Sequence, residues 1–253
     1  PEVVVHLAAQ PIVRTSYREP RLTFETNVTG TLNLLEAASS TPSVKAHVVV
    51  TTDKVYRNDG RTTGYSEADP LGAADPYSTS KAMADLLTQS WATSVDSPPL
   101  AVVRGGNVIG GGDVSEDRLV PDIIRHLAAN EQPVLRNPAS VRPWQHVLDC
   151  LDGYLAVATA LLRGDGAGAW NFGPRPGEVV TVAEVTEAAL AEWPREGGWI
   201  HDDSHQPHEA ALLTLDSSRA SRDLGWSNLL PYPESLSWVV AWHRAVADGG
   251  DPR

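Results

Sequence analysis

Residues 46–52 read Ala-His-Val-Val-Val-Thr-Thr, an apolar run of the length of a single β-strand. Similar runs precede and follow it, at Val3–Ala9 and Leu100–Asn107. Strands that alternate with helices predict βαβ units and a parallel sheet, so we expect an α/β fold. The helices are predicted from apolar residues at helical spacing, namely Phe24, Val28, Leu32 and Leu35 after Pro20, and Ala82, Leu86 and Leu87 after Tyr77.

Small and polar residues follow each of these runs. They are Ala8-Ala9-Gln10, Thr51-Thr52-Asp53 and Gly105-Gly106-Asn107. Ligands of parallel α/β sheets bind at the carboxyl ends of the strands, so this edge is the expected site. A further strand is predicted at 169–174, returning to the same sheet.

Tyr77 and Lys81 are four residues apart, behind Asp75 and Pro76. Asp is a good helix N-cap and Pro a good first helical residue, so the tyrosine and the lysine are predicted on one helix face, one turn apart. A nearby ammonium favours the phenolate of a tyrosine, which then serves as a base at neutral pH. The same spacing also occurs on ordinary solvated helix faces.

Thr52-Asp53-Lys54 forms the second candidate catalytic group. Only three lysines occur in the chain, Lys45, Lys54 and Lys81, and arginine supplies the remaining positive charge. A lysine kept where the chain otherwise uses arginine suggests a need for a titratable ammonium. The alternative is a polar turn after a buried strand.

Taken in order, the motifs resemble the extended short-chain dehydrogenases/reductases that act on nucleotide sugars. The resemblance is carried by His6–Pro11, Asn107–Asp113, Arg142–Val147 and Trp170–Gly173. The Asp53-Lys54 pair resembles the version of this motif found in the subfamily of CDP-glucose 4,6-dehydratases. The resemblance implies a partial Rossmann doubly wound parallel sheet, lacking the first βαβ units, with a smaller α/β substrate-binding lobe. It divides the chain into a remaining NAD-binding part, 1–109, and a mainly sugar-nucleotide-binding lobe, 110–253.

The resemblance also implies a mechanism. Tyr77, assisted by Lys81, takes the proton of the sugar 4-hydroxyl while Thr52 hydrogen-bonds that oxygen. Asp53 is the general acid for the departing 6-hydroxyl, and Lys54 is the candidate base at C5. Side by side, the carboxyl and the ammonium oppose the pKa shifts that each role needs, so they share one proton or point to different partners.

The remaining binding residues follow from the same resemblance. The cofactor NAD is expected at Leu7, Ala8, Ala9, Asn27, Thr51, Tyr77, Lys81 and Val108. The nucleotide sugar is expected at Gln10, Asn107, Leu119, Val120, Arg142 and His208. Arg142 fits a diphosphate because a guanidinium fork matches phosphate oxygens, and the net charge of −12 gives no general attraction for an anion. Residues 201–208 contain three histidines but match no common zinc spacing, so no metal is predicted.

Composition indicates a cytoplasmic enzyme that binds neither nucleic acid nor membrane. A single cysteine, Cys150, excludes an internal disulfide framework, and no apolar run reaches membrane-spanning length. The acidic balance disfavours nucleic acid. A homodimer through the helices that begin near Arg18 and Pro76 is a family expectation.

The chain opens at Pro1 in a predicted strand, with no G-x-x-G-x-x-G ahead of it. Such a loop cradles the dinucleotide pyrophosphate, so we expect an incomplete chain, or weak NAD binding if it is whole. Three hypotheses stay open: a nucleotide-sugar 4,6-dehydratase, an epimerase or decarboxylase of the same family, and a catalytically silent sugar-nucleotide-binding protein.

Overall fold

Four parallel strands form the sheet of the first structural unit. They are ordered β1 (Val3–His6), β2 (Ala46–Thr52), β3 (Leu100–Gly105) and β8 (Gly168–Phe172). β-branched and apolar side chains suit such strands because both faces of a parallel sheet are covered. The predicted parallel α/β sheet is confirmed, including its returning strand.

The structure is a computed structural model that describes residues 1–193, 197–204 and 213–251. By its contacts the chain forms two units. The first comprises Pro1–Gly106, Cys150–Gly173 and Leu213–Ser227, and the second comprises Asn107–Asp149, Pro174–Leu212 and Asn228–Arg253. Residues 150–173 and 213–227 thus belong to the sheet unit, together with the strand predicted to return near 169–174. The division into 1–109 and 110–253 that the resemblance implied stays a prediction.

Two strand ends differ from the predicted runs. β1 ends at His6, so Leu7–Ala9 lies beyond the strand. β3 ends at Gly105, and after Gly106 the chain enters β4 (Asn107–Ile109), which pairs with β7 (Trp144–His146) in a separate sheet. Glycines weaken strand pairing, so the run Leu100–Asn107 divides at this point between two sheets.

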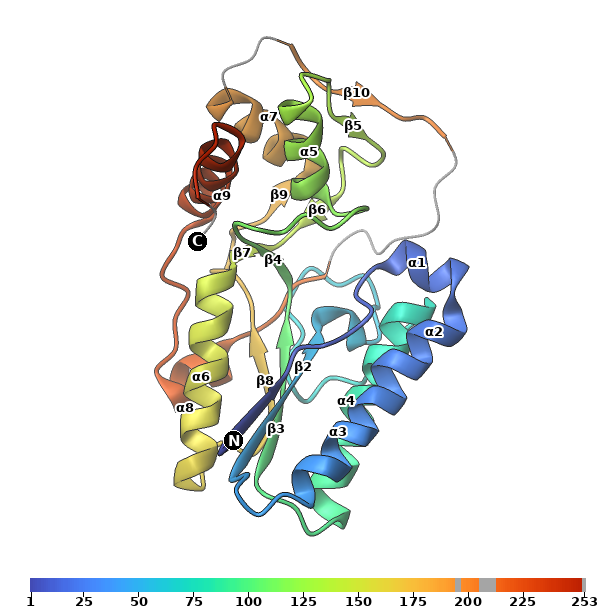
Figure 1. The fold of residues 1–253 in the computed structure, drawn as a ribbon, viewed down its shortest axis with the longest axis vertical. Coiled ribbons are helices and arrows are strands. Elements are labelled where there is room, and N and C mark those ends of the chain that lie inside the picture. The colour runs from blue at the N-terminus through green and yellow to red at the C-terminus, as the bar shows by residue number, and fades with distance from the viewer. Residues whose placement is uncertain (194–196, 205–212, 252–253) are drawn as a thin grey trace. The chain divides into compact units, whose positions relative to one another are not determined.

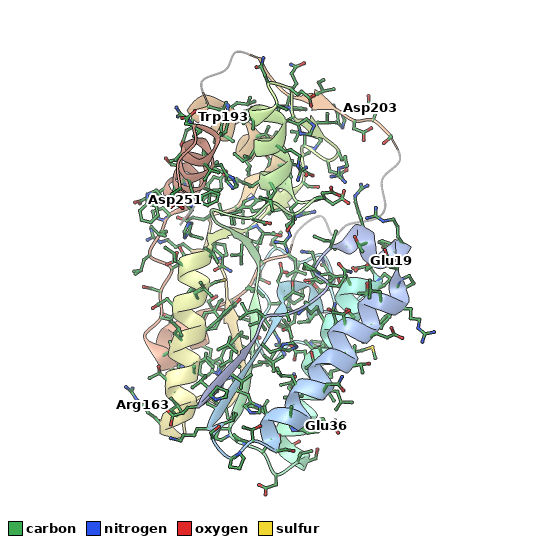
Figure 2. The ribbon with its side chains drawn as sticks, in the orientation of Figure 1. Glu19, Glu36, Arg163, Trp193, Asp203 and Asp251 are labelled. Atoms are coloured by element: carbon green, nitrogen blue, oxygen red, sulfur yellow. The ribbon has the colours of Figure 1, made fainter. Side chains whose placement is uncertain are left out.

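Helices cover both faces of the central sheet (Figure 1). One face carries the N-terminal helices and α4 (Pro76–Ser94), and the other carries α6 (Val147–Arg163). Figure 2 shows Glu36 and Arg163 on these opposite sides. α6 approaches β8 closely, since a Cβ atom at Gly153 would lie 2.4 Å from the Phe172 ring. This contact explains a glycine inside a helix, where it costs about 1 kcal/mol relative to alanine.

The first predicted helix is realised in consecutive pieces: α1 (Val13–Arg18), α2 (Pro20–Phe24), the π-helical turn η1 (Glu25–Thr29) and α3 (Gly30–Ser39). Of the spaced apolar residues, only Leu35 is buried, and the other buried positions include the polar Thr23 and Thr31. The hydrophobic spacing therefore predicted a helix here, but neither its buried face nor the π-turn. Single π-turns of this kind are frequent at functional sites. The buried residue of η1 is Asn27.

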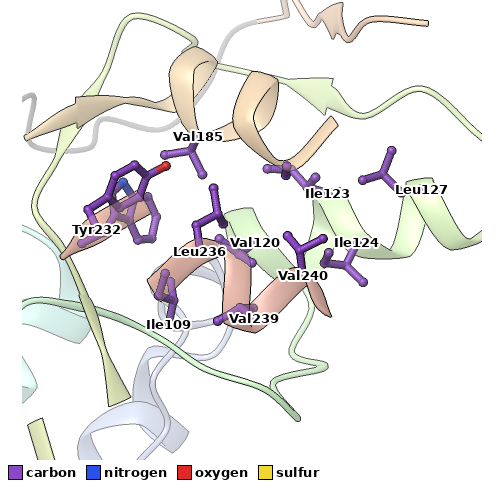
Figure 3. Packing of buried hydrophobic residues seen from close by; sticks show 12 residues of the cluster. Ile109, Val120, Ile123, Ile124, Leu127, Val185, Tyr232, Leu236, Val239 and Val240 are labelled. Carbon is purple, nitrogen blue, oxygen red and sulfur yellow. The ribbon is translucent and has the colours of Figure 1, made fainter. Parts of the chain in front are cut away.

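The second unit is built on an apolar cluster. Side chains of α5 (Leu119–Ala128), α7 (Val182–Glu192) and α9 (Tyr232–Ala247) point toward one another in Figure 3. α7 starts at a capping box of Thr181 and Glu184. The remaining elements are η2 (Asp53–Val55), β5 (Val134–Leu135), β6 (Val141–Arg142), β9 (Val180–Thr181), β10 (Ile200–His201) and α8 (Ser218–Leu224).

Candidate active site

The N-terminal half of α4 carries the predicted tyrosine and lysine on its buried face. Asp75 caps the helix by accepting a hydrogen bond from the Ser78 backbone N–H at 2.9 Å, and Pro76 occupies the first turn, as predicted. Tyr77 and Lys81 are 8% and 7% exposed. The Lys81 ammonium donates to the Val50 carbonyl at 3.0 Å. Burial lowers the pKa of Lys81 to about 8, so this ammonium titrates much closer to neutrality than an exposed lysine.

Thr52, Asp53 and Lys54 form the turn where β2 ends and η2 begins. The Thr52 hydroxyl donates to Asp53 Oδ1 at 2.8 Å and accepts from the Lys54 backbone N–H at 3.4 Å. Asp53 is 2% exposed. Lys54 Nζ lies 3.8 Å from Asp53 Oδ1, close enough for charge attraction but too long for a direct hydrogen bond. The turn therefore places a carboxyl and an ammonium side by side without a direct hydrogen bond between them.

The two groups belong to neighbouring elements. α4 packs against β2 and η2. The hydrogen bond from Lys81 to the Val50 carbonyl joins α4 to β2, two residues before Thr52. The fold therefore brings together the two motifs that the sequence singled out, although 24 positions separate Asp53 from Tyr77.

A buried polar network lies next to these residues, and sequence reasoning missed it. Asp85 of α4 accepts from Arg104 Nε at 2.8 Å and from Arg104 Nη2 at 2.9 Å. Arg104 Nη1 donates to the Tyr56 hydroxyl at 2.7 Å, which donates to Asn171 Oδ1 at 2.7 Å. The Thr51 hydroxyl also donates to Asp85, at 3.0 Å. Two signals were available: an arginine inside an apolar strand, and an aspartate one turn after Lys81.

The network also shifts the chemistry of its tyrosine. Burial raises the pKa of Tyr56 to about 12, although the neighbouring Arg104 guanidinium opposes that shift. Tyr56 therefore stays a neutral hydrogen-bonding link between Arg104 and Asn171. Its hydroxyl is a structural connection and not a base.

The loop after β1 is held by Asn27 from the π-turn. The Gln10 backbone N–H donates to Asn27 Oδ1 at 2.8 Å, and Asn27 Nδ2 donates to the Gln10 carbonyl at 3.0 Å and to Ser80 Oγ at 2.8 Å. Both donors of the Asn27 amide are thereby occupied. The Gln10 side chain is engaged as well, with Thr23 Oγ1 at 2.8 Å and with the backbone of Ile12. In this arrangement Asn27 and Gln10 fix the loop against α4.

The other residues predicted in the first unit lie at the carboxyl ends of β1 and β2. Leu7 is 51% exposed, Ala8 is exposed and Ala9 is half-buried. Thr51 is buried and bonded to Asp85. The binding roles of these residues stay predictions.

The remaining predicted residues lie in the second unit. Asn107 and Val108 are in β4, half-buried. Val120 is buried in the apolar cluster, so it could meet a ligand only through its backbone at the start of α5, where the N-cap residue makes no side-chain cap. Arg142 is half-buried in β6 and donates to the Val141 carbonyl at 3.0 Å. The last residues of this prediction are Leu119, half-buried in α5, and His208, which lies outside the described residues.

The glycine-rich stretch after β4 has a packing reason. A Cβ atom at Gly111 would lie 2.6 Å from the Trp242 ring of α9, so the loop backbone and this indole are in direct contact. Gly112 adopts φ 83°, a left-handed conformation that favours glycine. The glycines of this stretch thus allow its backbone to pack against the Trp242 ring inside the second unit.

Within residues 1–193, 197–204 and 213–251, no group of three or more His, Cys, Asp or Glu residues is arranged to hold a metal ion. His201 Nδ1 pairs with Asp203 Oδ1 at 3.0 Å. Over the same ranges, no helix combines the length and the apolar character needed to cross a bilayer. Cys150 is buried, and its sulfur accepts a hydrogen bond from the Tyr154 hydroxyl at 3.7 Å.

The residues at the end of β1 and on α4 are compatible with the predicted binding of NAD. After β1 the chain has small side chains at Ala8, which is exposed, and at Ala9, which is half-buried. Lys81 has three donors and, among the described residues, uses one of them, on Val50. Two donors therefore remain for the hydroxyls of a ribose.

Comparison with known proteins places these features in a family. Residues 1–173 match the NAD dependent epimerase/dehydratase family. The chain is 44% identical to CDP-glucose 4,6-dehydratase of Salmonella typhimurium over 99% of this chain and 73% of that protein. It is 33% identical to dTDP-glucose 4,6-dehydratase of Streptomyces griseus over 98% of this chain and 74% of that protein.

A solved structure agrees with these relatives. DesIV of Streptomyces venezuelae, a dTDP-glucose 4,6-dehydratase crystallised as a double mutant with NAD and DAU bound, superposes with a TM-score of 0.86 at 26% identity. The match covers 99% of this chain and 76% of that one. With its parallel sheet, its Tyr77/Lys81 helix and these relatives, the chain belongs to the NAD dependent epimerase/dehydratase family.

Proposed function

We propose that this protein is a nucleotide-sugar 4,6-dehydratase that converts CDP-glucose into a CDP-4-keto-6-deoxy sugar. The observation that carries the proposal is the 44% identity to CDP-glucose 4,6-dehydratase of Salmonella typhimurium along 99% of the chain. The Thr52-Asp53-Lys54 turn beside α4 supports it, because dehydration needs an acid and a base in addition to the tyrosine that serves oxidation.

The oxidation step is assigned to α4 and to the end of β2. NAD, when bound, supplies the acceptor for the hydride of C4 and later returns that hydride to C6. Tyr77 removes the proton of the 4-hydroxyl, and the Lys81 ammonium one turn away favours the phenolate form. Thr52, whose hydroxyl already contacts Asp53 at 2.8 Å, hydrogen-bonds the same sugar oxygen.

The elimination step is assigned to Asp53 and Lys54. A 4-keto group acidifies the proton at C5. Asp53 in its protonated form donates to the departing 6-hydroxyl, and Lys54 in its neutral form accepts the C5 proton. Their separation of 3.8 Å supports two distinct roles, since neither side chain is hydrogen-bonded to the other. The atoms balance as loss of one water from the hexose.

The predicted binding residues are assigned to two ligands, NAD and the nucleotide sugar. The first unit would hold NAD through Leu7, Ala8, Ala9, Thr51, Tyr77 and Lys81, with Asn27 fixing the loop. The second unit would supply contacts to the nucleotide sugar from Asn107, Leu119 and Arg142. Their polar and backbone groups suit a diphosphate and a sugar.

We propose that the protein is cytoplasmic and forms a homodimer in which α2 and α4 of each protomer contact the partner. These two helices pack together and expose apolar side chains at Leu22, Met83 and Leu86. Exposed apolar patches of this kind mark interaction surfaces. Light scattering of the Leu86→Glu variant checks the proposal: a monomer is expected, and an unchanged molar mass contradicts it.

The test of function is incubation with NAD and with CDP-, dTDP- or UDP-glucose, followed by mass and NMR analysis of the sugar. The expected result is loss of one water, with CDP-glucose converted fastest. An epimerised hexose of unchanged mass, or binding without conversion of any of the three, would overturn the proposal.

Lys54 is tested separately. In Lys54→Gln we expect oxidation to persist and elimination to fail, so that reduced nicotinamide accumulates and no deuterium enters C5 from solvent. Lys45→Gln is the matched control, because Lys45 is exposed and pairs with Glu2 away from the turn. Normal product formation by Lys54→Gln would remove Lys54 from the mechanism.

A further inference from the structure

Asp85 and Arg104 form a fully buried ion pair between α4 and β3. Their side chains are 0% and 1% exposed. The two parallel bonds of Arg104, at 2.8 and 2.9 Å, fix the carboxylate in the plane of the guanidinium. A buried pair of this kind contributes little net stability, because desolvation of both ions offsets their attraction. We therefore consider which neighbouring groups the Asp85–Arg104 pair positions.

The sequence position of Asp85 makes it a natural partner for Lys81. The two residues are four apart on the same buried face of α4, and oppositely charged side chains at this spacing are neighbours on a helix. A free carboxylate at Asp85 would therefore attract the Lys81 ammonium. Tyr77 lies one further turn toward the helix start.

The structure has a different pairing. Lys81 Nζ donates to the Val50 carbonyl, and no ion pair joins it to a carboxylate in the part of the chain that the structure describes. Both Asp85 oxygens are occupied by other donors. Besides Arg104, the Thr51 hydroxyl reaches Oδ2 at 3.0 Å and Gln89 Nε2 reaches Oδ1 at 2.6 Å.

The other titratable groups around α4 do not replace this carboxylate. On the strands and turns packed against the helix, the buried ones are His47, Asp53 and Arg104. Burial lowers the pKa of His6 of β1, and the Lys81 charge lowers it further. The helices α1, α2, η1 and α3 contribute no buried ionisable group, only Arg14, Tyr17, Arg18, Arg21, Glu25 and Glu36.

We propose that Arg104 is a positioning residue that holds the Asp85 carboxylate away from Lys81, so that the Lys81 ammonium remains unpaired on the helix face it shares with Tyr77. An unpaired ammonium favours the phenolate more strongly than one neutralised by a carboxylate. Only the purpose of this arrangement, activation of Tyr77, rests on the proposed function. The charge arrangement itself is a property of the protein alone.

Titration of Lys81 in the free protein tests the proposal. With three lysines in the chain, a sample labelled with ¹³C at lysine Cε gives three signals, assigned through Lys45→Arg and Lys54→Arg. In the unaltered protein we expect Lys81 to titrate near its pKa of about 8. In Arg104→Met the released Asp85 should raise that pKa by one unit or more. Lys45, exposed and paired with Glu2, should not move.

The double variant Asp85→Leu/Arg104→Met removes both charges and is expected to fold, since apolar replacements of buried pairs are well tolerated. Its Lys81 pKa should stay within about 0.3 units of the unaltered protein, because the pair acts on Lys81 as a neutral unit. A fall of one unit or more in the double variant would mean that Asp85 already stabilises the ammonium, and would overturn the proposal even if Arg104→Met did not fold. An unshifted Lys81 in folded Arg104→Met would overturn it as well. Neither outcome depends on whether CDP-glucose is a substrate.

Discussion

The first unit buries a chain of charged and polar side chains between α4 and the sheet, whereas the second unit buries an apolar cluster between α5, α7 and α9. In the first, Asp85, Arg104, Tyr56 and Asn171 are each 1% exposed or less. In the second, Leu236, Val240 and Val185 are equally buried and carry no polar group. Burial of apolar side chains stabilises the folded state, whereas burial of charged side chains costs desolvation free energy and fixes the orientation of neighbouring groups. Substitutions in the first unit should therefore change mainly activity, and substitutions in the second should change mainly the free energy of unfolding.

The largest effect is expected from Tyr77→Phe. Loss of the base should lower kcat by about 10³-fold, while the free energy of unfolding changes by only about 1 kcal/mol. Steady-state rates with CDP-glucose and denaturant unfolding measure the two quantities. A kcat within tenfold of the unaltered enzyme would remove Tyr77 from the catalytic role.

The reverse behaviour is expected from Leu236→Ala. Leu236 is 1% exposed at the centre of the apolar cluster in Figure 3, so its truncation leaves a cavity and should lower the free energy of unfolding by about 3 kcal/mol. The kcat of the folded protein should stay within about twofold, as no predicted catalytic group is altered. Leu229→Ala is the matched control, because Leu229 is 68% exposed and should change stability little. Equal effects of the two substitutions would contradict the assignment of a tightly packed core.

A smaller effect concerns pH. His47 of β2 is 1% exposed, its ring nitrogens have no partner among the described residues, and burial lowers its pKa from 6.5. The unfolded chain therefore takes up a proton near pH 6.5 that the folded chain resists. Stability is unaffected above that pH and is lost as the pH falls below it.

Replacement by an apolar residue removes this contribution. Unfolding of His47→Leu, followed between pH 8 and 5, should depend less on pH than that of the unaltered protein. The exposed His201 gives the control: His201→Leu should follow the unaltered protein. Parallel curves for His47→Leu and the unaltered protein would show that His47 is not the source of the acid sensitivity.

The smallest effect is expected from Tyr232→Phe. The Tyr232 hydroxyl is buried beside the apolar cluster, and no hydrogen-bond partner for it exists in the described part of the chain. A buried hydroxyl without a partner is unfavourable, so its removal should leave stability unchanged or raise it by up to about 1 kcal/mol. Thermal unfolding measures this, and activity should be unaltered. A loss of stability would reveal a partner such as an ordered water.

Much of the first unit was accessible from local sequence patterns. The run Ala46–Thr52 is β2 residue for residue, and Asp75-Pro76 starts α4 as predicted. The returning strand predicted at 169–174 corresponds to β8, which begins one residue earlier and ends two residues earlier. These predictions succeed because strand runs and helix caps depend on neighbours in the sequence.

The candidate site was predicted in part. Tyr77, Lys81 and Thr52–Lys54 were found from spacing and from a family resemblance, and the structure packs α4 on β2 and η2. Asn27 and Gln10 hydrogen-bond each other and hold the loop after β1, which spacing could not indicate, and their binding roles stay predictions. The π-turn that carries Asn27 was missed because its apolar residues keep helical spacing through it.

Local sequence patterns encode the order of strands and helices, the capped start of α4 and the residues predicted for proton transfer. Each of these depends on a few neighbouring positions, through side-chain periodicity or a local hydrogen bond. The pairing of Asp85 with Arg104 and not with Lys81, and the packing of Trp242 on Gly111, arise only when distant elements fold together. Those choices join residues 19 and more positions apart, where packing of separate elements selects the partner from several chemically equivalent ones.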